Sequence, residues 1–162
     1  MIVISDTSPI TNLAAVELLE ILHILYNRVI IPQAVYDEMT ALGYPVPGTV
    51  EVQNLDWIET QSVSDRSRVE ELQLQLDRGE AEAIVLALEL NADLLLIDER
   101  RGRKIALEQK VTQITGLLAI LQEAKVKNLI PAIKPILDRL ITENNFRISD
   151  KLYHTIIKFA GE

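Results

Sequence analysis

The sequence predicts an α/β fold, with a mainly parallel central sheet, helices on both of its faces and further helices at the C-terminal end. Two observations predict this class. Short, wholly apolar runs at residues 2–4 and 94–97 have the length and composition of strands buried on both faces. These runs alternate with longer segments that begin at helix-start residues such as Ser8 and Pro9. Such alternation is typical of a parallel sheet covered by helices on both sides.

Helix starts and a loop divide the first part of the chain. Ser8 can cap a helix whose first position is Pro9, and Pro32 suits the first position of another helix. Residues 43–48 contain two glycines and two prolines and are the clearest loop. From the N-terminus we expect a strand at 2–5, helices at 8–14 and 16–25, a strand at 28–31, a helix at 32–41 and a strand at 57–63.

The second part of the chain is mostly helical. Ser64 is the expected cap of a polar helix, and a longer helix begins near Asp77. The apolar run at 94–97, bounded by aspartates, is the best strand prediction, and Gly161 ends the last helix. We expect helices at 64–76 and 80–90, a strand at 94–97, a helix at 100–109, a weaker strand at 110–114, and helices at 115–125, 131–143 and 149–160.

Composition limits the chemistry that the protein can perform. The 162 residues fit one domain, and a hydrophobic share of 48% supplies a sizeable core. The chain has no cysteine, which excludes disulfides, thiolate metal sites and thiol nucleophiles. Its two histidines make a zinc site improbable on composition. No leader segment precedes Asp6 and no apolar run is long enough to cross a bilayer, so we expect a cytoplasmic protein without a membrane partner.

Several enzyme classes are excluded because their motifs are missing. The sequence contains neither a GxGxxG nor a GxxxxGK[ST] pattern, which argues against dinucleotide and P-loop sites. It also lacks the nucleophile elbow of serine hydrolases. Phosphatases that form an aspartyl phosphate need a second acid two residues after the first, where this chain has Ser8.

Charge is distributed unevenly along the chain. The net charge is −8, yet residues 100–134 carry eight basic and only two acidic side chains. A local basic patch can attract an anion even when the total charge opposes it. The alternative is an ordinary solvated helix face. The basic residues that lie closest together are Arg100, Arg101, Arg103 and Lys104.

Four carboxylates stand out by their context, and two of them would meet at one edge of the sheet if the strands before them are neighbours. Asp6 follows the first strand and Asp98 follows a later one, and ligands of parallel sheets bind at such carboxyl ends. Glu38 lies on the helix after Pro32, and Glu80 begins the long central helix. Each has a structural alternative, as a cap or turn residue, as ordinary helix surface, or as a charge favoured by the helix dipole.

Gathered carboxylates need relief from repulsion, since a pair at ~4 Å repels by about 4 kcal/mol at an effective dielectric of about 20. We therefore expect raised carboxylate pKa values in the metal-free pocket. Mg²⁺ or Mn²⁺ would also relieve the repulsion, because these hard cations prefer oxygen ligands. An all-carboxylate metal site suits phosphodiester hydrolysis, and the basic run at 100–104 would hold phosphates at its rim.

Around these residues the sequence resembles the PIN-domain family, and within it the VapC-like proteins of prokaryotes. The similarity covers about residues 1–125, and it depends on the order and spacing of several short patterns. They are DTSPI at 6–10, PQAVYDE at 32–38, DRGEAEA at 77–83 and LLIDE at 95–99.

The resemblance implies a three-layer α/β/α sandwich and a ribonuclease dependent on Mg²⁺ or Mn²⁺, often a dimer and often the toxin of a toxin–antitoxin pair. An RNA substrate, an antitoxin protein and a second copy of the chain are the partners it implies. Carried over by position, the catalytic and metal-binding acids are Asp6, Glu38, Glu80 and Asp98. The implied supporting side chains are Ser8, Asn12, Glu99 and Thr115, and the expected RNA contacts are Arg100, Arg101, Arg103 and Lys104.

The same resemblance suggests how the chain is divided. Residues 1–127 would form the nuclease domain, and residues 128–162 would form a helical extension packed on it. The extension has no part in the four patterns, and it could pack on the core, form a dimer contact or bind an antitoxin. The alternative to an enzyme is a catalytically weak or inactive binding module that acts through a protein or RNA partner.

Overall fold

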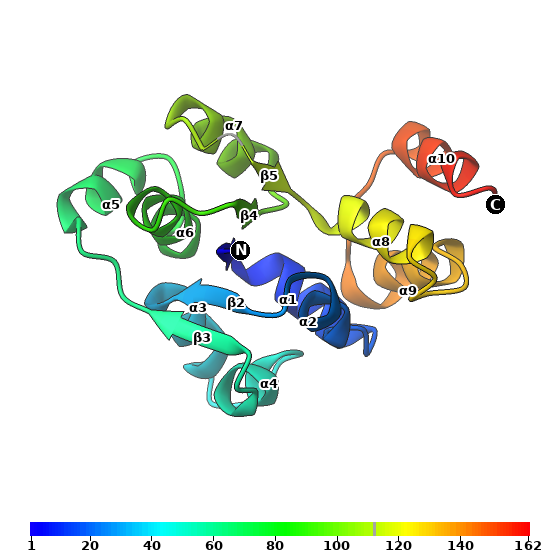
Figure 1. Ribbon diagram of the computed structural model, residues 1–162, viewed down its shortest axis with the longest axis horizontal. Helices are drawn as coiled ribbons and strands as arrows, with labels where there is room; N and C mark the ends of the chain where they lie inside the picture. Colours follow the sequence, from blue (N-terminus) through cyan, green and yellow to red (C-terminus); the bar gives the residue numbers. More distant parts are fainter. Residues whose placement is uncertain (112) are drawn as a thin grey trace.

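A parallel sheet of five strands is the centre of the fold. The computed structural model describes residues 1–111 and 113–162, and within them the strand order is β3-β2-β1-β4-β5 with every neighbouring pair parallel. Helices cover both faces of this sheet (Figure 1), which confirms the predicted α/β/α sandwich. The strands are β1 (Val3–Ser5), β2 (Val29–Pro32), β3 (Ile58–Gln61), β4 (Leu94–Leu96) and β5 (Ile114–Thr115).

The helices form two layers, each with its own apolar core. Helices α5, α6 and α7 contribute to the core on one face, whereas α1, α2, α8 and α9 contribute to the core on the other. Among the described residues, no helix combines the length and the apolar character needed to cross a membrane. The helices are α1 (Thr7–Ala15), α2 (Glu20–Tyr26), α3 (Gln33–Thr40), α4 (Thr49–Asn54), α5 (Arg66–Leu72), α6 (Arg78–Glu89), α7 (Arg100–Glu108), α8 (Leu117–Val126), α9 (Lys134–Asn144) and α10 (Asp150–Phe159).

The central strands are apolar at nearly every position, with Ser5 at the end of β1 as the exception, because each of their faces is buried. On β1, Val3 belongs to the core beneath α1 and α8, and the next residue, Ile4, belongs to the core beneath α5, α6 and α7. On β4, Leu95 and Leu96 alternate in the same way. Successive strand side chains point to opposite faces, so a strand covered on both sides needs apolar residues at every position.

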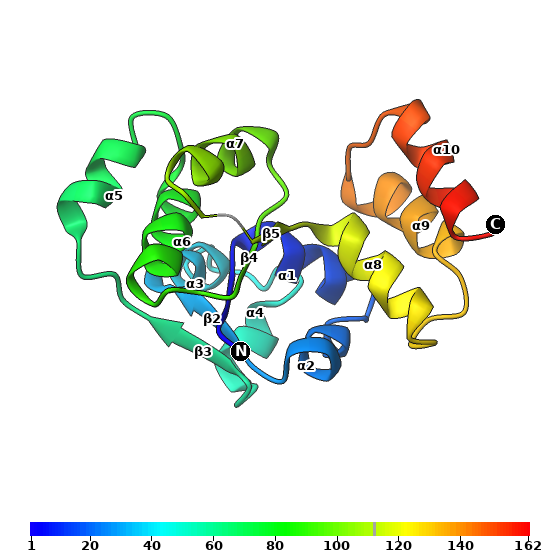
Figure 2. The ribbon, with the colours of Figure 1, turned by 45° about the horizontal axis from the view of Figure 1, so that its top comes forward.

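The C-terminal helices α9 and α10 lie at the opposite end of the molecule from α5 (Figures 1 and 2). Leu140 of α9 and Ile156 of α10 belong to the same core as Ile10 of α1. The carboxylate of Glu162 also accepts a hydrogen bond of 2.8 Å from the backbone N–H of Ile133, just before α9. These contacts attach the segment firmly, while the proposed boundary between residues 127 and 128 stays a prediction.

The predicted start of the first helix at Ser8 and Pro9 is wrong. Helix α1 begins at Thr7, and Asp6 occupies the cap position with an extended backbone. Proline is tolerated anywhere in the first helical turn, so Pro9 marks the turn without marking its first residue. The Asp6 side chain makes no capping hydrogen bond. Capping of the helix, the simplest explanation for an acid at this position, therefore does not apply to the Asp6 carboxylate.

Other boundaries differ from the prediction for local reasons. Helix α2 begins later than expected, after Glu17 adopts a left-handed backbone with φ 61°. Helix α4 was not predicted; it follows Gly48, whose φ of 96° turns the chain out of the loop. Asp65, and not Ser64, caps α5. The strand predicted at 110–114 corresponds to the shorter β5, and residue 112 of that prediction lies outside the described residues.

Candidate active site

The strand order reverses at the centre of the sheet. Strand β1 pairs with β2 on one side and with β4 on the other, and the chain crosses from one half of the sheet to the other on its way from β3 to β4. Asp6 directly follows β1 and Asp98 lies two residues beyond β4. The backbone N–H of Asp6 donates to the carbonyl of Leu96 at 2.9 Å, which holds the two strand ends side by side. Open parallel sheets bind ligands at this kind of reversal point.

An acidic cavity of about 390 Å³ opens at this edge of the sheet. Three of the four predicted acids line it, Asp6, Glu38 and Glu80, and they come from three different elements. Asp98 lines a larger neighbouring cavity, which shares Ser8 with the acidic one. The structure therefore brings the four acids to one edge, across two adjoining cavities. The full lining of the acidic cavity is Asp6, Thr7, Ser8, Thr11, Glu38, Asp77, Glu80 and Glu99.

Glycines allow the carboxylates to approach closely. A Cβ atom placed on Gly79, at the start of α6, would lie 3.1 Å from Glu38 Oε2 and 3.4 Å from Asp6 Oδ1. A Cβ atom on Gly116 would lie 2.7 Å from Asp98 Oδ1. Any larger residue at these positions would push the carboxylates apart, so the backbone itself forms part of the cavity wall.

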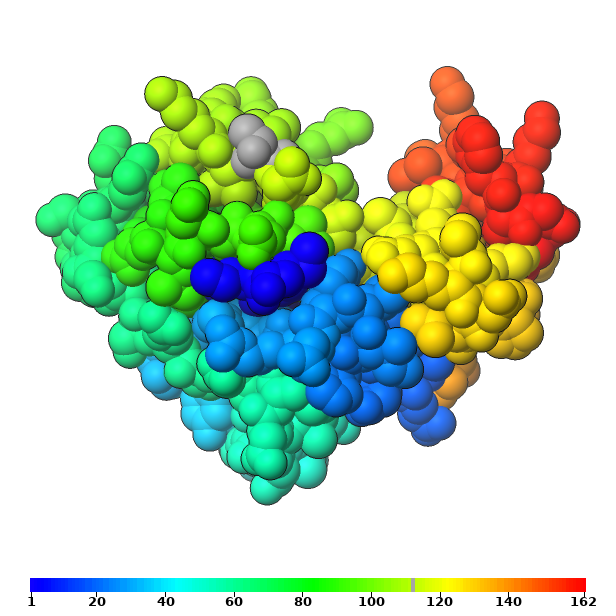
Figure 3. All heavy atoms as spheres, viewed as in Figure 1, coloured from blue at the N-terminus to red at the C-terminus, as the bar shows by residue number. Residues whose placement is uncertain are grey.

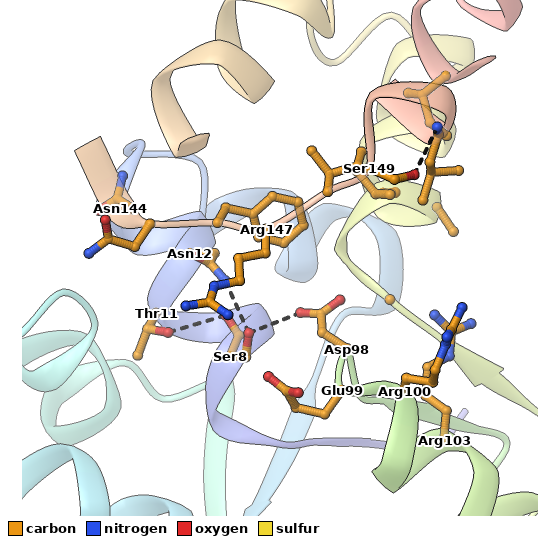
Figure 4. Close-up of a pocket in the computed structure, with 18 of the residues that line it drawn as sticks. Ser8, Thr11, Asn12, Asp98, Glu99, Arg100, Arg103, Asn144, Arg147 and Ser149 are labelled. Carbon is orange, nitrogen blue, oxygen red and sulfur yellow. Dashed lines mark hydrogen bonds between the residues drawn. The ribbon is translucent and has the colours of Figure 1, made fainter. Parts of the chain in front are cut away.

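Hydroxyl and amide groups fix the orientation of two of the acids. The Asn12 amide donates to Ser8 Oγ at 3.0 Å, and Ser8 Oγ donates to Asp98 Oδ2 at 3.1 Å (Figure 4). The backbone N–H of Leu117 donates to the other oxygen of Asp98 at 2.7 Å. Thr7 Oγ1 donates to Glu38 Oε2 at 2.9 Å. Ser8 therefore contacts Asp98 and Asn12 contacts Ser8, while a supporting role of the two side chains in catalysis stays a prediction.

Burial, with a smaller contribution from neighbouring acids, raises the pKa values of three carboxylates at the site, Asp6, Glu80 and Asp98. Burial raises the pKa of Asp6 to about 7; the Thr7 amide opposes this shift, and the charges of Asp77, Glu38 and Asp98 add to it. The pKa of Glu80 rises to about 8, through burial and through its hydrogen bond with Asp77. Burial also raises the pKa of Asp98, although hydrogen bonds from Leu117 and Ser8 partly offset this. The pKa values rise as expected, but the largest cause is burial, whereas the expectation rested on repulsion between the carboxylates.

The donor set fits a hard divalent cation. Every side chain lining the acidic cavity offers oxygen atoms, the ligands that Mg²⁺ and Mn²⁺ prefer. No salt bridge among the described residues neutralises Asp6, Glu38, Glu80 or Asp98. In the same part of the chain, no three acidic or histidine side chains are placed so that together they could hold a metal ion. The negative charge that would attract a cation is therefore present, but the carboxylates would have to move closer together to coordinate it.

The predicted basic run is divided between two sides of α7. Arg100 and Arg103 line the larger cavity, as two residues three positions apart on a helix share one side. Arg101 and Lys104 are exposed but are not among the residues that line either cavity. Thr115 lies on β5, where its backbone carbonyl accepts from the N–H of Ile97 at 2.9 Å. A supporting role for its hydroxyl stays a prediction.

Three residues near these cavities were not selected from the sequence. Asp77 caps α6, accepting from the N–H of Glu80 at 2.8 Å, and also lines the acidic cavity. Asp77 and Glu80 have the sequence spacing of a capping box. A capping role alone accounts for an acid at position 77, so the pattern does not indicate a second role in the cavity. Arg147 lines the larger cavity, and Glu82 is fully buried behind the acidic one. No local pattern distinguishes either of these two.

The metal-free protein should lose stability as pH rises from 5 to 8. Asp6 and Glu80 release their protons near pH 4 in the unfolded chain but only near pH 7–8 in the folded one. The folded state therefore binds more protons in this window, and stability falls as they leave. In EDTA we expect a Tm roughly 5 °C lower at pH 8 than at pH 5. A Tm that stays level or rises over this interval contradicts the prediction.

Comparison with known proteins agrees with this architecture. A family model described as a PIN domain matches residues 2–162, and so includes the C-terminal helices as well as the sheet. No curated protein matches the chain significantly. PIN domains are generally nucleases, and the fold is accordingly nuclease-like. Because the family model matches nearly the whole sequence, the chain belongs to the PIN-domain family.

Proposed function

We propose that the protein is an endoribonuclease that depends on Mg²⁺ or Mn²⁺. The observation that carries the proposal is that Asp6, Glu38 and Glu80, from distant parts of the chain, line one cavity with no neutralising ion pair among the described residues. A nuclease-like fold and an adjoining cavity lined by arginines support it.

The proposed roles follow from the contacts of each side chain. Asp6, Glu38, Glu80 and Asp98 would hold the cation, which when bound activates water and neutralises charge on phosphate oxygens. Ser8, itself oriented by Asn12, fixes the rotamer of Asp98. Thr7 does the same for Glu38. Arg100 and Arg103 would hold the phosphates of the strand to be cut.

Replacing Asp98 with asparagine tests the proposal. We expect the wild type to cleave labelled RNA with Mg²⁺ or Mn²⁺ and to stop in EDTA. D98N should cleave at least about 10²–10³-fold more slowly at saturating Mg²⁺, since losing a metal ligand removes several kcal/mol of transition-state stabilisation. The variant should also need more Mg²⁺ for its residual activity.

Asp56→Asn is the matched control, because Asp56 is exposed and precedes β3, at the edge of the sheet opposite the strand ends that form the cavity. Equal cleavage by D98N and D56N, or cleavage that persists in EDTA, contradicts the proposed chemistry. RNA that is bound but never cut, at any concentration of either metal, indicates the binding module instead.

We extend the proposal to a VapC-like toxin that acts as a homodimer in the cytoplasm. The four motif patterns support the toxin role, and the family membership is compatible with it. Co-expression with the product of an adjacent small reading frame tests it: growth arrest by the wild type, relieved by that product, is the expected result. Equal growth of cells expressing the wild type and D98N would count against the toxin role. Light scattering of the purified chain measures its oligomeric state.

A further inference from the structure

A large cavity of about 1110 Å³ lies between the strand ends and the C-terminal helices. Residues of α1, α7 and α8 form one side, and residues of the α9–α10 connection and of α10 form the other. The space-filling view shows a notch between the atoms around α7 and those of α10 (Figure 3). The cavity shares Ser8, Thr11 and Glu99 with the acidic cavity, so the two form one continuous surface.

The connection between α9 and α10 has a fixed shape. It begins at Asn145, whose left-handed backbone ends α9, and the next N–H, of Phe146, donates to the carbonyl of Leu140 at 3.1 Å. At its other end Ser149 Oγ accepts from the N–H of Leu152 at 3.1 Å and caps α10. A segment held at both ends can present a side chain in a defined direction.

That side chain is Arg147. Its neighbours Phe146 and Ile148 are partly buried and pack against the main core, while Arg147 between them is exposed. Because its two apolar neighbours are held against the core, Arg147 between them stays at the surface. Its side chain reaches across the cavity toward Ser8 and Asn12 on α1 (Figure 4). In the described part of the chain it forms no salt bridge.

The cavity therefore presents arginines from both sides. Arg100 and Arg103 line it from α7, and Arg147 lines it from the C-terminal segment. Guanidinium groups bind phosphate oxygens in a planar, paired geometry. Leu118 and Leu152 supply apolar surface within the same cavity. Positive groups along a groove with apolar surface between them are typical of sites for single-stranded nucleic acid, whose unstacked bases expose apolar faces.

We propose that the C-terminal segment forms the second wall of a groove for single-stranded RNA, and that Arg147 binds a backbone phosphate of the strand entering the acidic cavity. The inference rests on the proposed nuclease function and adds the path of the substrate. It assigns to residues 144–149 a direct part in RNA binding.

Binding measured without cleavage tests this path. Fluorescence anisotropy of a labelled ten-nucleotide single-stranded RNA in EDTA, over a series of NaCl concentrations, gives affinity and its salt dependence. Arg147→Ala should weaken binding about tenfold and make the log–log salt slope shallower by about 0.7, the value for one lost phosphate contact on a single strand. Arg147→Lys should keep the slope while losing part of the affinity, because it retains the charge but not the paired geometry.

Lys151→Ala is the matched control, as Lys151 is a nearby exposed cation that is not among the residues lining the groove. The RNA affinity of K151A should stay within about twofold of that of the wild type, as expected for a charge without a phosphate contact. Equal losses in R147A and K151A, or a wild type that binds no RNA, overturn the inference. Stronger, Arg147-dependent binding of an acidic peptide of equal charge overturns it in favour of a protein ligand.

The outcomes for the groove and for the nuclease are separate. Cleavage by the wild type with Mg²⁺, together with unchanged RNA binding by R147A, leaves the nuclease standing and removes the groove. Arg147-dependent binding without any cleavage retains the RNA path and removes the nuclease. Because Arg147 is exposed, R147A should unfold at the wild-type Tm, which excludes misfolding as the cause of weaker binding.

Discussion

Replacing Asp6 with asparagine is expected to abolish RNA cleavage and, at the same time, to make the metal-free protein more stable. Asp6 is only 5% exposed, and burial with neighbouring charges raises its pKa to about 7. At pH 8 the folded protein must therefore keep a carboxylate ionised in surroundings that disfavour it. An asparagine has nearly the same shape without the charge. We expect a gain of about 1–3 kcal/mol in the free energy of unfolding, discounting the full shift for relaxation.

Urea unfolding in EDTA at pH 8 and at pH 5 measures the effect. The gain should shrink at pH 5, where most wild-type molecules already carry a proton on Asp6. With saturating Mg²⁺ the order should reverse, because the cation stabilises only the folded state that binds it. Asp56→Asn, at an exposed position, should leave the free energy of unfolding unchanged at both pH values. A D6N protein less stable than the wild type at pH 8 in EDTA would mean that Asp6 is compensated by a contact in the folded state.

The convergence of Asp6 and Asp98 was predictable because sheet polarity decides it. In a parallel sheet the carboxyl ends of all strands lie at one edge. Two acids that each follow a short apolar strand therefore come together whenever those two strands are neighbours. Strands β1 and β4 are such neighbours. Glu80 was predictable for a related reason, since the helix that leads into a parallel strand begins at the edge where the strands end, and α6 leads into β4.

The second wall of the groove could not be predicted in this way. Arg147 lies between two apolar residues in a connection of irregular backbone, and no periodicity marks its direction. Its position depends on how α9 packs against α1, a contact between residues more than 120 positions apart in the chain. The dense basic run at 100–104 predicted the phosphate contacts instead, yet only Arg100 and Arg103 of that run line the cavity. Density along the sequence is a weaker guide than the direction of each side chain.

Replacing Glu82 with alanine is expected to destabilise the protein by about 2–4 kcal/mol, the largest loss among the acidic residues near the site. Glu82 is fully buried on α6, two residues after Glu80 and on the opposite side of the helix. Its Oε1 accepts from the N–H of Ala34 at 3.0 Å, at the start of α3. Its Oε2 accepts from Arg78 Nε at 3.0 Å and from Arg66 Nη1 at 3.1 Å.

The three partners of Glu82 differ in what they lose when the carboxylate is removed. Arg66 and Arg78 have side chains that are 49% exposed, so water can replace their contact with the carboxylate. The amide of Ala34 is buried and has no such replacement, and a void would remain beside it. Glutamine at position 82 keeps an oxygen for that amide, so E82Q should lose only about half as much as E82A.

The same contact connects stability with the proposed chemistry. Because Glu82 holds the first turn of α3, its loss should also move Glu38, which lies on that helix and lines the acidic cavity. We expect E82A to need roughly tenfold more Mg²⁺ for half-maximal cleavage. This is the size of effect seen when a residue that orients a metal ligand is removed. Urea unfolding and a Mg²⁺ titration measure the two effects, with Glu71→Ala, an exposed acid on α5, as the control. If E82A and E71A have the same free energy of unfolding, the buried carboxylate does not hold α3 in place. The proposed effect of Glu82 on the position of Glu38 is then contradicted.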